Sequence, residues 1–238
     1  ILEQAQEEAD VIIWDGGDND FPFFRPDLFI VVVDPLRAGH ERRYHPGETN
    51  LRMADVVVVN KIDSAEPEQV ARVLADIEAL NPEAAVVRAE SPVEIGDPLM
   101  LAGKAVLVVD DGSTITHGEM AFGAGTVAAR YAGASEIIDP RPWAVGSIAE
   151  VYERFPHIGH VLPAMGYGDE QLRELEETIN AIPCDVVVTG TPIDLGRLID
   201  SRHPILHATY SLREIGEPTL EELLEPVLHR VDVGFALV

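Results

Sequence analysis

The chain has 238 residues, of which 46% are hydrophobic, so it can bury the core of one large domain or of two modest ones. Its 42 acidic residues outnumber its 17 basic residues, and the net charge of −25 predicts that neither nucleic acid nor an anionic membrane is a partner. The single cysteine, Cys184, excludes an internal disulfide and fits a reducing cytoplasm.

Three short apolar runs near the start predict buried parallel strands, because each is too short for a buried helix and rich in β-branched residues. They are Val11–Trp14, Leu28–Val33 and Val56–Val59. Polar residues follow each run: Asp15 follows the first, Asp34 the second and Asn60 the third. Since ligands in open α/β sheets bind at the carboxyl ends of strands, we expect the ligand site at this edge.

The chain continues with one helix, one strand and a linker. Apolar residues at helical spacing predict an amphipathic helix over Pro67–Leu80, with Ser64 as its cap. A further short strand is predicted over Ala84–Ala89. Proline and glycine in Ser91–Gly103 indicate a linker, so residues 1–100 are predicted to form the first domain.

After this linker, strands and helices alternate afresh, which predicts a second doubly wound unit over residues 101–238. The predicted strands are Ala105–Val109, Glu136–Ile138, Ile158–Leu162, Asp185–Val188 and Ile205–Tyr210. The predicted helices lie near Met120–Tyr131, Ser147–Arg154, Asp169–Ile182, Ile193–Ile199 and Thr219–Leu228. The predicted fold class is α/β, with a three-layer α/β/α domain and a mostly parallel sheet followed by a second doubly wound α/β unit.

The loop from Asp34 to Arg52 is too long for a simple connector, and it gathers positive charge in an acidic chain. Arginine forks suit bidentate contacts with phosphate, and histidines can donate to phosphate oxygens or transfer protons. The alternative is a solvated loop in which Arg37, Arg42 and Arg43 pair with Glu41 and Glu48. The candidate catalytic residues of this loop are Arg37, His40, Arg43 and His45.

Two further catalytic candidates lie in the second half. His117 belongs to a stretch rich in glycine and hydroxyl groups, Asp110–Gly118, whose backbone can approach an anion closely. The alternative there is an ordinary turn before a helix. Arg141 lies between two prolines on a stiff segment that suits a phosphate fork, and the alternative is a surface kink. In Thr189–Asp194, a strand, a turn and a helix start are predicted, with Thr191 as the cap.

The residues Asn60-Lys61-Ile62-Asp63 resemble the base-recognition motif of P-loop GTPases, in which the aspartate binds guanine and the lysine stem packs on the ring. Asp15 likewise resembles the aspartate that holds Mg²⁺ through its water shell, with Asp18 or Asp20 as a supporting partner. The resemblance therefore implies nucleotide binding by Asn60, Lys61 and Asp63, and metal binding by Asp15. The sequence departs from the pattern because it contains no G-x-x-x-x-G-K-[ST].

Longer stretches resemble the cyclic 2,3-diphosphoglycerate synthetase family over nearly the whole chain. They are WDGGDNDFPFFRPDL, VVVDPLRAGHERRYHPGETNLRMADVVVVNKID, DDGSTITHGEMAFGAG, DPRPWAVGSIAEVYERFPHIGHVLPAMGYG and VVVTGTPIDLGRLI. The resemblance implies a cytoplasmic, archaeal, ATP- and Mg²⁺-dependent ligase. It would close 2,3-diphosphoglycerate into an intramolecular phosphoric anhydride and release ADP and phosphate. We also expect a homodimer, and an acidic surface with fifteen arginines against two lysines indicates a salt-loving source.

The resemblance also implies that the phosphate-binding loop and another domain lie upstream, so residues 1–100 are read as the carboxyl-terminal part of a P-loop NTPase-like domain. Residues 1–238 alone are therefore expected to fold imperfectly and to show no turnover.

A second functional class, a GTP-dependent regulatory or metal-delivery GTPase, stays open because the Asn60–Asp63 motif argues for guanine. The arginine-rich loop and the second unit favour the ligase, since a switch needs neither. The single cysteine leaves no thiolate cluster for metal delivery.

Overall fold

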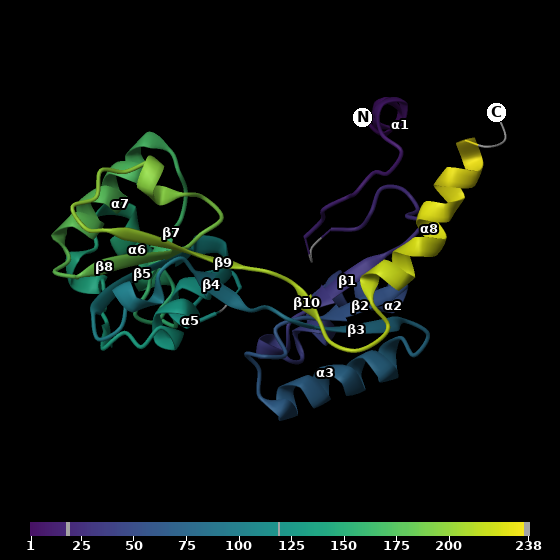
Figure 1. The fold of residues 1–238 in the computed structure, drawn as a ribbon, viewed down its shortest axis with the longest axis horizontal. Helices are drawn as coiled ribbons and strands as arrows, with labels where there is room; N and C mark the ends of the chain where they lie inside the picture. Colours follow the sequence, from purple (N-terminus) through teal and green to yellow (C-terminus); the bar gives the residue numbers. More distant parts are fainter. Residues whose placement is uncertain (18–19, 119, 236–238) are drawn as a thin grey trace. The chain divides into compact units, whose positions relative to one another are not determined.

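The computed structural model describes residues 1–17, 20–118 and 120–235, and the chain divides into two units (Figure 1). The first unit comprises Ile1–Pro92 and Leu212–Val238, and the second comprises Val93–Ser211. Both units contain mostly parallel sheet with helices, which confirms the predicted α/β fold. The division differs from the predicted boundary at residue 100, because the second unit begins earlier and the last helix belongs to the first unit.

The sheet of the first unit has the strand order β1-β2-β3-β10. Strands β1 (Ile30–Val33), β2 (Val56–Val59) and β3 (Ala85–Glu90) are parallel, and β10 (Arg213–Glu214) is antiparallel to β3. The helices are α1 (Leu2–Glu8), α2 (Gly47–Met53), α3 (Pro67–Leu80) and α8 (Leu220–Phe235). The 3-10 turns η1 (Pro35–Arg37) and η2 (His40–Arg42) follow β1. Even α8, the longest of the described helices, is too short or too polar to cross a membrane, and so are the others.

Each face of this sheet has its own apolar core. All four valines of β2 are buried, as expected for a central parallel strand. Val57 and Val59 pack with residues of α2 and α3 on one face. Val56 and Val58 belong to the core of the other face, which the first turn of α8 partly covers. Figure 1 shows α3 and α8 on opposite sides of the sheet. The helices therefore cover its faces, and the connecting loops lie at the strand ends.

Helix α3 spans Pro67–Leu80 as predicted, but its predicted cap is wrong. Proline occupies the first helical position, where a missing N–H costs nothing and the fixed φ favours the helix start. Glu66 precedes it, and the Glu66 N–H donates to Gln69 Oε1 at 2.9 Å. The Ser64 N–H donates to the carbonyl of Lys61 at 3.1 Å, so Ser64 lies in the turn that follows β2.

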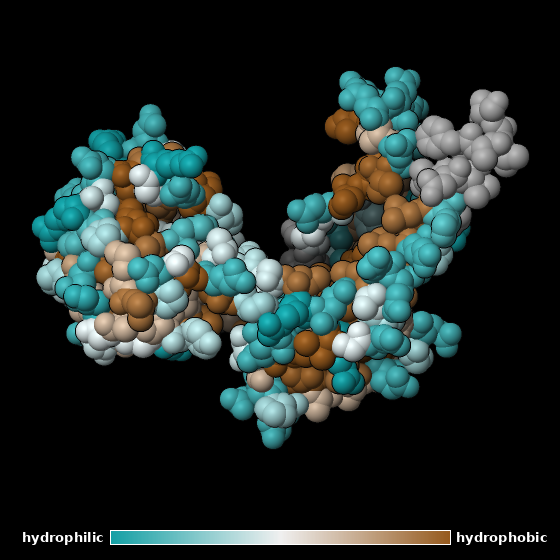
Figure 2. Space-filling model, viewed as in Figure 1, coloured by the Kyte–Doolittle hydropathy of each residue, from teal (hydrophilic) through white to brown (hydrophobic). Residues whose placement is uncertain are grey.

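The predicted strand Val11–Trp14 does not form, and this prediction was wrong. Val11, Ile12 and Ile13 are exposed, and the exposed fraction of Ile13 is 86%. None of the described strands pairs with this segment, and β1 keeps an open edge with Val32 64% exposed. Figure 2 shows the apolar surface that this leaves on the first unit. Apolar patterning reports a preference for burial, whereas a parallel strand also needs a neighbour for its backbone groups.

The sheet of the second unit has the order β4-β9-β8-β5-β6, and β7 also pairs with β5. The strands are β4 (Val93–Ile95), β5 (Ala105–Asp111), β6 (Glu136–Ile137), β7 (Leu162–Ala164), β8 (Val186–Gly190) and β9 (Ile205–Tyr210). The helices are α4 (Gly112–Ile115), α5 (Ala124–Tyr131), α6 (Gly146–Arg154) and α7 (Asp169–Ala181). The pairs of β5 with β6, β7 and β8 are parallel, and only β4 is antiparallel.

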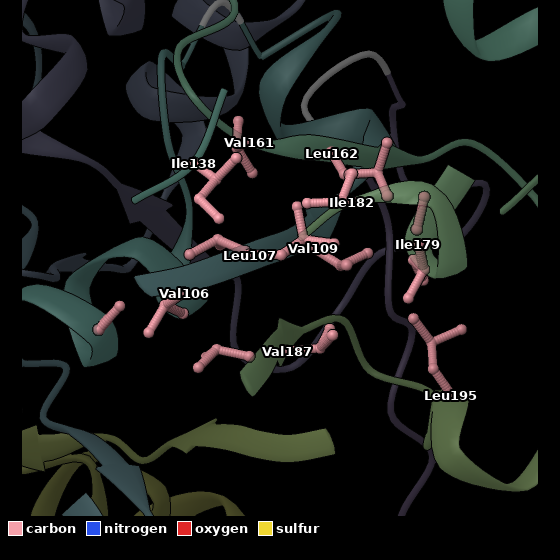
Figure 3. Close-up of a cluster of buried hydrophobic side chains, with 14 of the residues drawn as sticks. Val106, Leu107, Val109, Ile138, Val161, Leu162, Ile179, Ile182, Val187 and Leu195 are labelled. Atoms are coloured by element: carbon pink, nitrogen blue, oxygen red, sulfur yellow. The ribbon is translucent and has the colours of Figure 1, made fainter. Parts of the chain in front are cut away.

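The core of the second unit surrounds β5. Val106, Leu107, Val108 and Val109 are all fully buried. Figure 3 shows β5 side chains packed among residues of β7, α7 and β8. Because the strand is fixed along its length by this packing, the polar residues at its carboxyl end are held in a defined position.

Several predicted elements of the second unit are shorter or shifted. The predicted helix Ile193–Ile199 is one 3-10 turn, η5 (Leu195–Arg197), and Asp194 caps it by accepting the Gly196 N–H at 3.2 Å. Thr191 was wrongly predicted as this cap, and its hydroxyl donates to the Ile193 carbonyl at 2.8 Å. The predicted linker Ser91–Gly103 contains β4 and the 3-10 turn η3 (Pro98–Met100).

Candidate functional site

An ion pair joins the carboxyl ends of β1 and β2 in the first unit. Lys61 places its Nζ 2.8 Å from Oδ2 of Asp34, the residue directly after β1. The Arg37 guanidinium lies 3.3 Å from the same oxygen, and the other carboxylate oxygen accepts the Leu36 N–H at 3.0 Å. The Asp34 side chain is only 10% exposed. Two cations therefore share one carboxylate at the edge where the sequence predicts the ligand site.

Lys61 holds an unusual backbone conformation, with φ of 58°. This left-handed region is rare for residues other than glycine and costs about 1–3 kcal/mol when the surrounding structure enforces it. The Asn60 side chain stabilises the turn, because its Oδ1 accepts the Lys61 N–H at 2.9 Å. Asn60 thus positions Lys61, and Lys61 in turn pairs with Asp34.

Asp63 connects the loops that follow β2 and β3. Its Oδ1 accepts the backbone N–H of Ser91 at 2.9 Å. The side chain is at the surface, and its Oδ2 has no hydrogen-bond partner among the described residues. The carboxylate is therefore held in place by one oxygen and can present the other to a ligand.

The basic residues of the loop after β1 divide into two groups. Arg42 donates to Asp76 of α3 at 2.7 Å, and Arg52 donates to Glu48 at 2.8 Å. These two arginines therefore act within the fold. Arg43 is exposed, and its guanidinium forms no hydrogen bond or ion pair within the described part of the chain. The alternative, in which Arg37, Arg42 and Arg43 pair with Glu41 and Glu48, is therefore wrong. Arg37 pairs with Asp34 and Arg42 with Asp76.

The two candidate histidines of this loop contact aromatic rings. The His40 ring meets Tyr44 edge-on at a centroid distance of 5.0 Å, and His40 is half-buried. The His45 ring meets Phe21 at 5.7 Å, and His45 is exposed. Among the described residues, neither imidazole has a hydrogen-bond partner, so both can donate to a ligand.

A pair of carboxyl groups, Glu41 and Asp76, anchors the loop to α3. Burial and the neighbouring Asp76 raise the pKa of Glu41. Burial also acts to raise the pKa of Asp76, but hydrogen bonds from Glu41 and Arg42 outweigh it and lower this pKa. Asp76 therefore keeps its charge while Glu41 binds a proton more readily. Glu41 also accepts the Gly39 N–H at 2.8 and 3.0 Å, which fixes the start of η2.

The predicted metal ligand Asp15 lies on the exposed segment after Val11–Trp14. Its predicted partner Asp18 lies outside the described residues, and Asp20 contributes its backbone carbonyl to Asn50 Nδ2 at 3.0 Å. Over residues 1–17, 20–118 and 120–235, no three His, Cys, Asp or Glu side chains come together as a metal site. Mg²⁺ usually keeps several waters and takes one or two protein carboxylates together with substrate phosphates, so metal binding by Asp15 stays a prediction.

At the carboxyl end of β5, Asp110 is completely buried, and the sequence reasoning did not single it out. Its Oδ1 accepts the Gly125 N–H at 2.8 Å, and its Oδ2 accepts the Gly123 N–H at 2.8 Å and the Thr126 hydroxyl at 3.2 Å. A Cβ on Gly123, Gly125 or Gly190 would collide with this carboxylate or with the backbone beside it. The sequence signal is a strand that ends in aspartate, followed along the chain by a Gly-x-Gly-Thr at the start of a helix.

The two candidate catalytic residues of the second unit, Arg141 and His117, differ in how far other groups of the chain already bind their side chains. Arg141 pairs with Asp139 at 2.9 Å, donates to the carbonyl of Ile158, and lies 5.2 Å from the Tyr152 ring centroid. Its guanidinium is therefore engaged in the fold, which corresponds to neither predicted alternative. His117 is exposed, and its ring meets Phe155 edge-on at 5.6 Å.

The geometry of the first unit, a strand end with Lys61 and Asp63 beside a cationic loop, is typical of a nucleotide site. Residues 6–88 match the CobW/HypB/UreG nucleotide-binding domain. The matched range includes β1, β2 and α3, most of β3 and all the loop residues described above. The first unit therefore contains a P-loop-type nucleotide-binding domain.

Archaeal synthetases are among the relatives of this chain. The chain is 56% identical over 225 residues to arginine synthetase ArcE of Thermococcus kodakarensis. The aligned region covers 94% of this chain and 50% of the relative. The chain is 31% identical over 75 residues to the cyclic 2,3-diphosphoglycerate synthetase of Pyrococcus furiosus, covering 32% of this chain and 17% of the relative. A cyclic 2,3-diphosphoglycerate synthetase of Thermococcus gammatolerans is 31% identical over 101 residues, 42% of this chain and 22% of the relative. The chain thus spans half the length of the arginine synthetase and less of the others.

Proposed function

We propose that the protein is a nucleotide-dependent synthetase that forms arginine. The observation that carries the proposal is the 56% identity with an arginine synthetase across 94% of this chain. The site is compatible with it, because cations next to a nucleotide-type strand end can neutralise charge during phosphoryl transfer. A ligase of this kind agrees with the first of the two classes that the sequence left open.

The chemistry of such a synthetase follows from the product. A guanidinium group forms when an amine replaces the oxygen of a ureido group, and that oxygen is a poor leaving group. Transfer of the γ-phosphoryl group to this oxygen converts it into phosphate, which departs when ammonia attacks the carbon. Citrulline, ammonium and ATP are consumed, and arginine, ADP, phosphate and one proton are released.

We propose ATP as the nucleotide. Guanine offers two neighbouring donors to a carboxylate, the ring N–H and the exocyclic amine, whereas adenine offers one amine. Asp63 has one oxygen engaged with Ser91, which leaves one oxygen free for a base. This arrangement favours adenine, although the motif Asn60–Asp63 resembles a guanine-binding motif.

A second candidate reaction is the closure of 2,3-diphosphoglycerate by ATP. It is favoured by the weaker likeness to cyclic 2,3-diphosphoglycerate synthetases and by the cationic loop, which suits a substrate with two phosphates. Both reactions use a phosphoryl group to activate an oxygen, so the same domain can serve either.

The test is to incubate the full-length protein with each nucleotide and each acceptor. We expect arginine and ADP from ATP, citrulline and ammonium. Formation of cyclic 2,3-diphosphoglycerate, seen by ³¹P NMR, without arginine would replace the first candidate by the second. Hydrolysis of GTP that needs neither acceptor would favour the regulatory GTPase.

Replacement of Arg43 by alanine should lower kcat/KM about ten- to a hundredfold, because a charged hydrogen bond contributes about 1.5–3 kcal/mol. Arg37→Ala should give a loss of similar size. Lysine at either position should restore part of the activity, since it keeps the charge and loses the fork. Arg52→Ala is the matched control in the same loop, because its guanidinium is engaged with Glu48. Parental kinetics in both Arg37→Ala and Arg43→Ala, at low and at high salt, would show that the loop is an ordinary solvated surface.

A further inference from the structure

An open groove of about 380 Å³ lies between the loop after β1 and the first turns of α3. The loop contributes Arg37 and His40, together with the apolar surfaces of Leu36 and Ala38. Helix α3 contributes three residues of its exposed side, Glu68, Gln69 and Arg72. Arg72 lies outside the Lys61–Asp34–Arg37 cluster, and no sequence motif selects it.

The backbone of the loop positions the Arg72 guanidinium. Gly39 has a φ of 100°, and a Cβ at this position would collide with the Arg72 side chain, so the guanidinium lies directly over the glycine. The Gly39 N–H is fixed by Glu41, whose carboxyl group belongs to the pair with Asp76. The loop can approach Arg72 this closely only because residue 39 lacks a side chain.

Arg72 also keeps its donors free. The charge of Arg72 helps to lower the pKa of Asp76, one turn further along α3, but Asp76 accepts its hydrogen bond from Arg42 at 2.7 Å. Within the described ranges, the Arg72 guanidinium forms no hydrogen bond or ion pair. A guanidinium with five N–H donors at the wall of a groove is therefore available to a ligand.

The opposite wall carries two further donors. Arg37 is tethered to Asp34 at 3.3 Å, and Asp34 is shared with Lys61 at 2.8 Å, so Arg37 is only partly neutralised. His40 contacts Tyr44 by its ring and has unoccupied ring nitrogens in the described structure. Glu68 is the acidic residue among those that line the groove, and its negative charge opposes these donors. In a chain of net charge −25, an anion binds only where cations are concentrated in this way.

We infer that this groove binds a small anion that carries a phosphate or carboxylate group, with Arg72 as its main ligand. Planar guanidinium forks match both groups bidentately, and Arg37 and His40 complete the set from the facing loop. The inference goes beyond the proposed function, because it holds whichever product the protein forms.

Isothermal titration calorimetry of the full-length protein with inorganic phosphate tests the inference, with ADP present to occupy the nucleotide site. We expect saturable binding by the parental protein and affinity at least about tenfold weaker in Arg72→Gln. Arg72→Lys should be intermediate, since the charge is kept and the fork is lost. A parallel titration with acetate identifies the preferred group, because binding of phosphate alone selects phosphate and binding of both admits a carboxylate.

Arg173→Gln is the matched control. Arg173 is an exposed arginine of α7 in the second unit, so its replacement changes the net charge equally without touching the groove. It should leave phosphate binding unchanged. No binding of phosphate or acetate by the parental protein, or equal affinity in the parental protein and Arg72→Gln, would overturn the inference. A loss in Arg173→Gln as large as in Arg72→Gln would likewise overturn it, because the effect would then come from overall charge.

Discussion

Replacement of Asp110 by alanine should lower the free energy of unfolding by roughly 3–5 kcal/mol, because several donors in the interior lose their acceptor at once. The carboxylate has an exposed fraction of 0% and accepts hydrogen bonds from Gly123, Gly125 and Thr126. Without it, the buried Gly125 N–H and Thr126 hydroxyl and the half-buried Gly123 N–H lose their acceptor, and each buried donor left without one costs about 1–3 kcal/mol. Urea unfolding followed by circular dichroism measures the change.

Asp185→Ala is the control for this measurement. Asp185 also accepts one backbone N–H of β5, that of Ala105 at 3.0 Å, but this contact is exposed. Its loss should cost no more than about 1 kcal/mol, because water can replace the carboxylate. Equal stability of Asp110→Ala and Asp185→Ala would contradict the structural role of Asp110.

The pH dependence of stability gives an independent check on Asp110. Burial raises the pKa of this carboxyl group above its ordinary value, although the hydrogen bonds act to lower it. As the pH rises between the unfolded and folded pKa values, the unfolded chain loses the proton first, so the group's contribution to stability decreases. This contribution is complete below the unfolded pKa and is lost as the pH rises through the folded pKa. The difference in unfolding free energy between the parental protein and Asp110→Asn should therefore depend on pH in this direction.

The local elements were predictable because their signals are local. Helix α3 has proline at its first position and apolar residues at helical spacing, and it begins and ends where predicted. Strand β2 consists of four consecutive valines and was likewise predicted correctly. The failure at Val11–Trp14 has the opposite cause, since pairing depends on a strand elsewhere in the sequence that supplies hydrogen bonds.

The candidate site was predictable in composition but not in geometry. The sequence placed Lys61, Asp63 and the cationic loop at strand ends, and the structure brings Lys61 and Arg37 to the same carboxylate. The sequence alone could not predict that Arg141 pairs with Asp139, because this contact depends on the rotamers of both side chains. The place of Arg72 in the groove was also not predictable, since it depends on Gly39, which lies 33 residues earlier.

Replacement of Asp63 by asparagine should change the base preference of the full-length protein. In the parental protein, Oδ1 accepts the Ser91 N–H, and Oδ2 is free to accept the amine of adenine. Asparagine keeps one oxygen for Ser91 and turns an NH₂ group toward the base, where it faces a donor in adenine and an acceptor oxygen in guanine. Steady-state kinetics should show kcat/KM for ATP reduced about ten- to a hundredfold, with GTP reduced much less or improved.

The matched control for this variant is Asp55→Asn, because the Asp55 carboxylate also accepts a backbone N–H, that of Phe29 at 2.8 Å. Asp55 lies at the opposite, amino-terminal end of β2, away from the Lys61–Asp34 pair. It should leave the ratio of kcat/KM for ATP and GTP unchanged. Parental activity with GTP that disappears in Asp63→Asn, while ATP turnover is retained, would show that Asp63 binds guanine. That result would overturn the assignment of the free Asp63 oxygen to adenine.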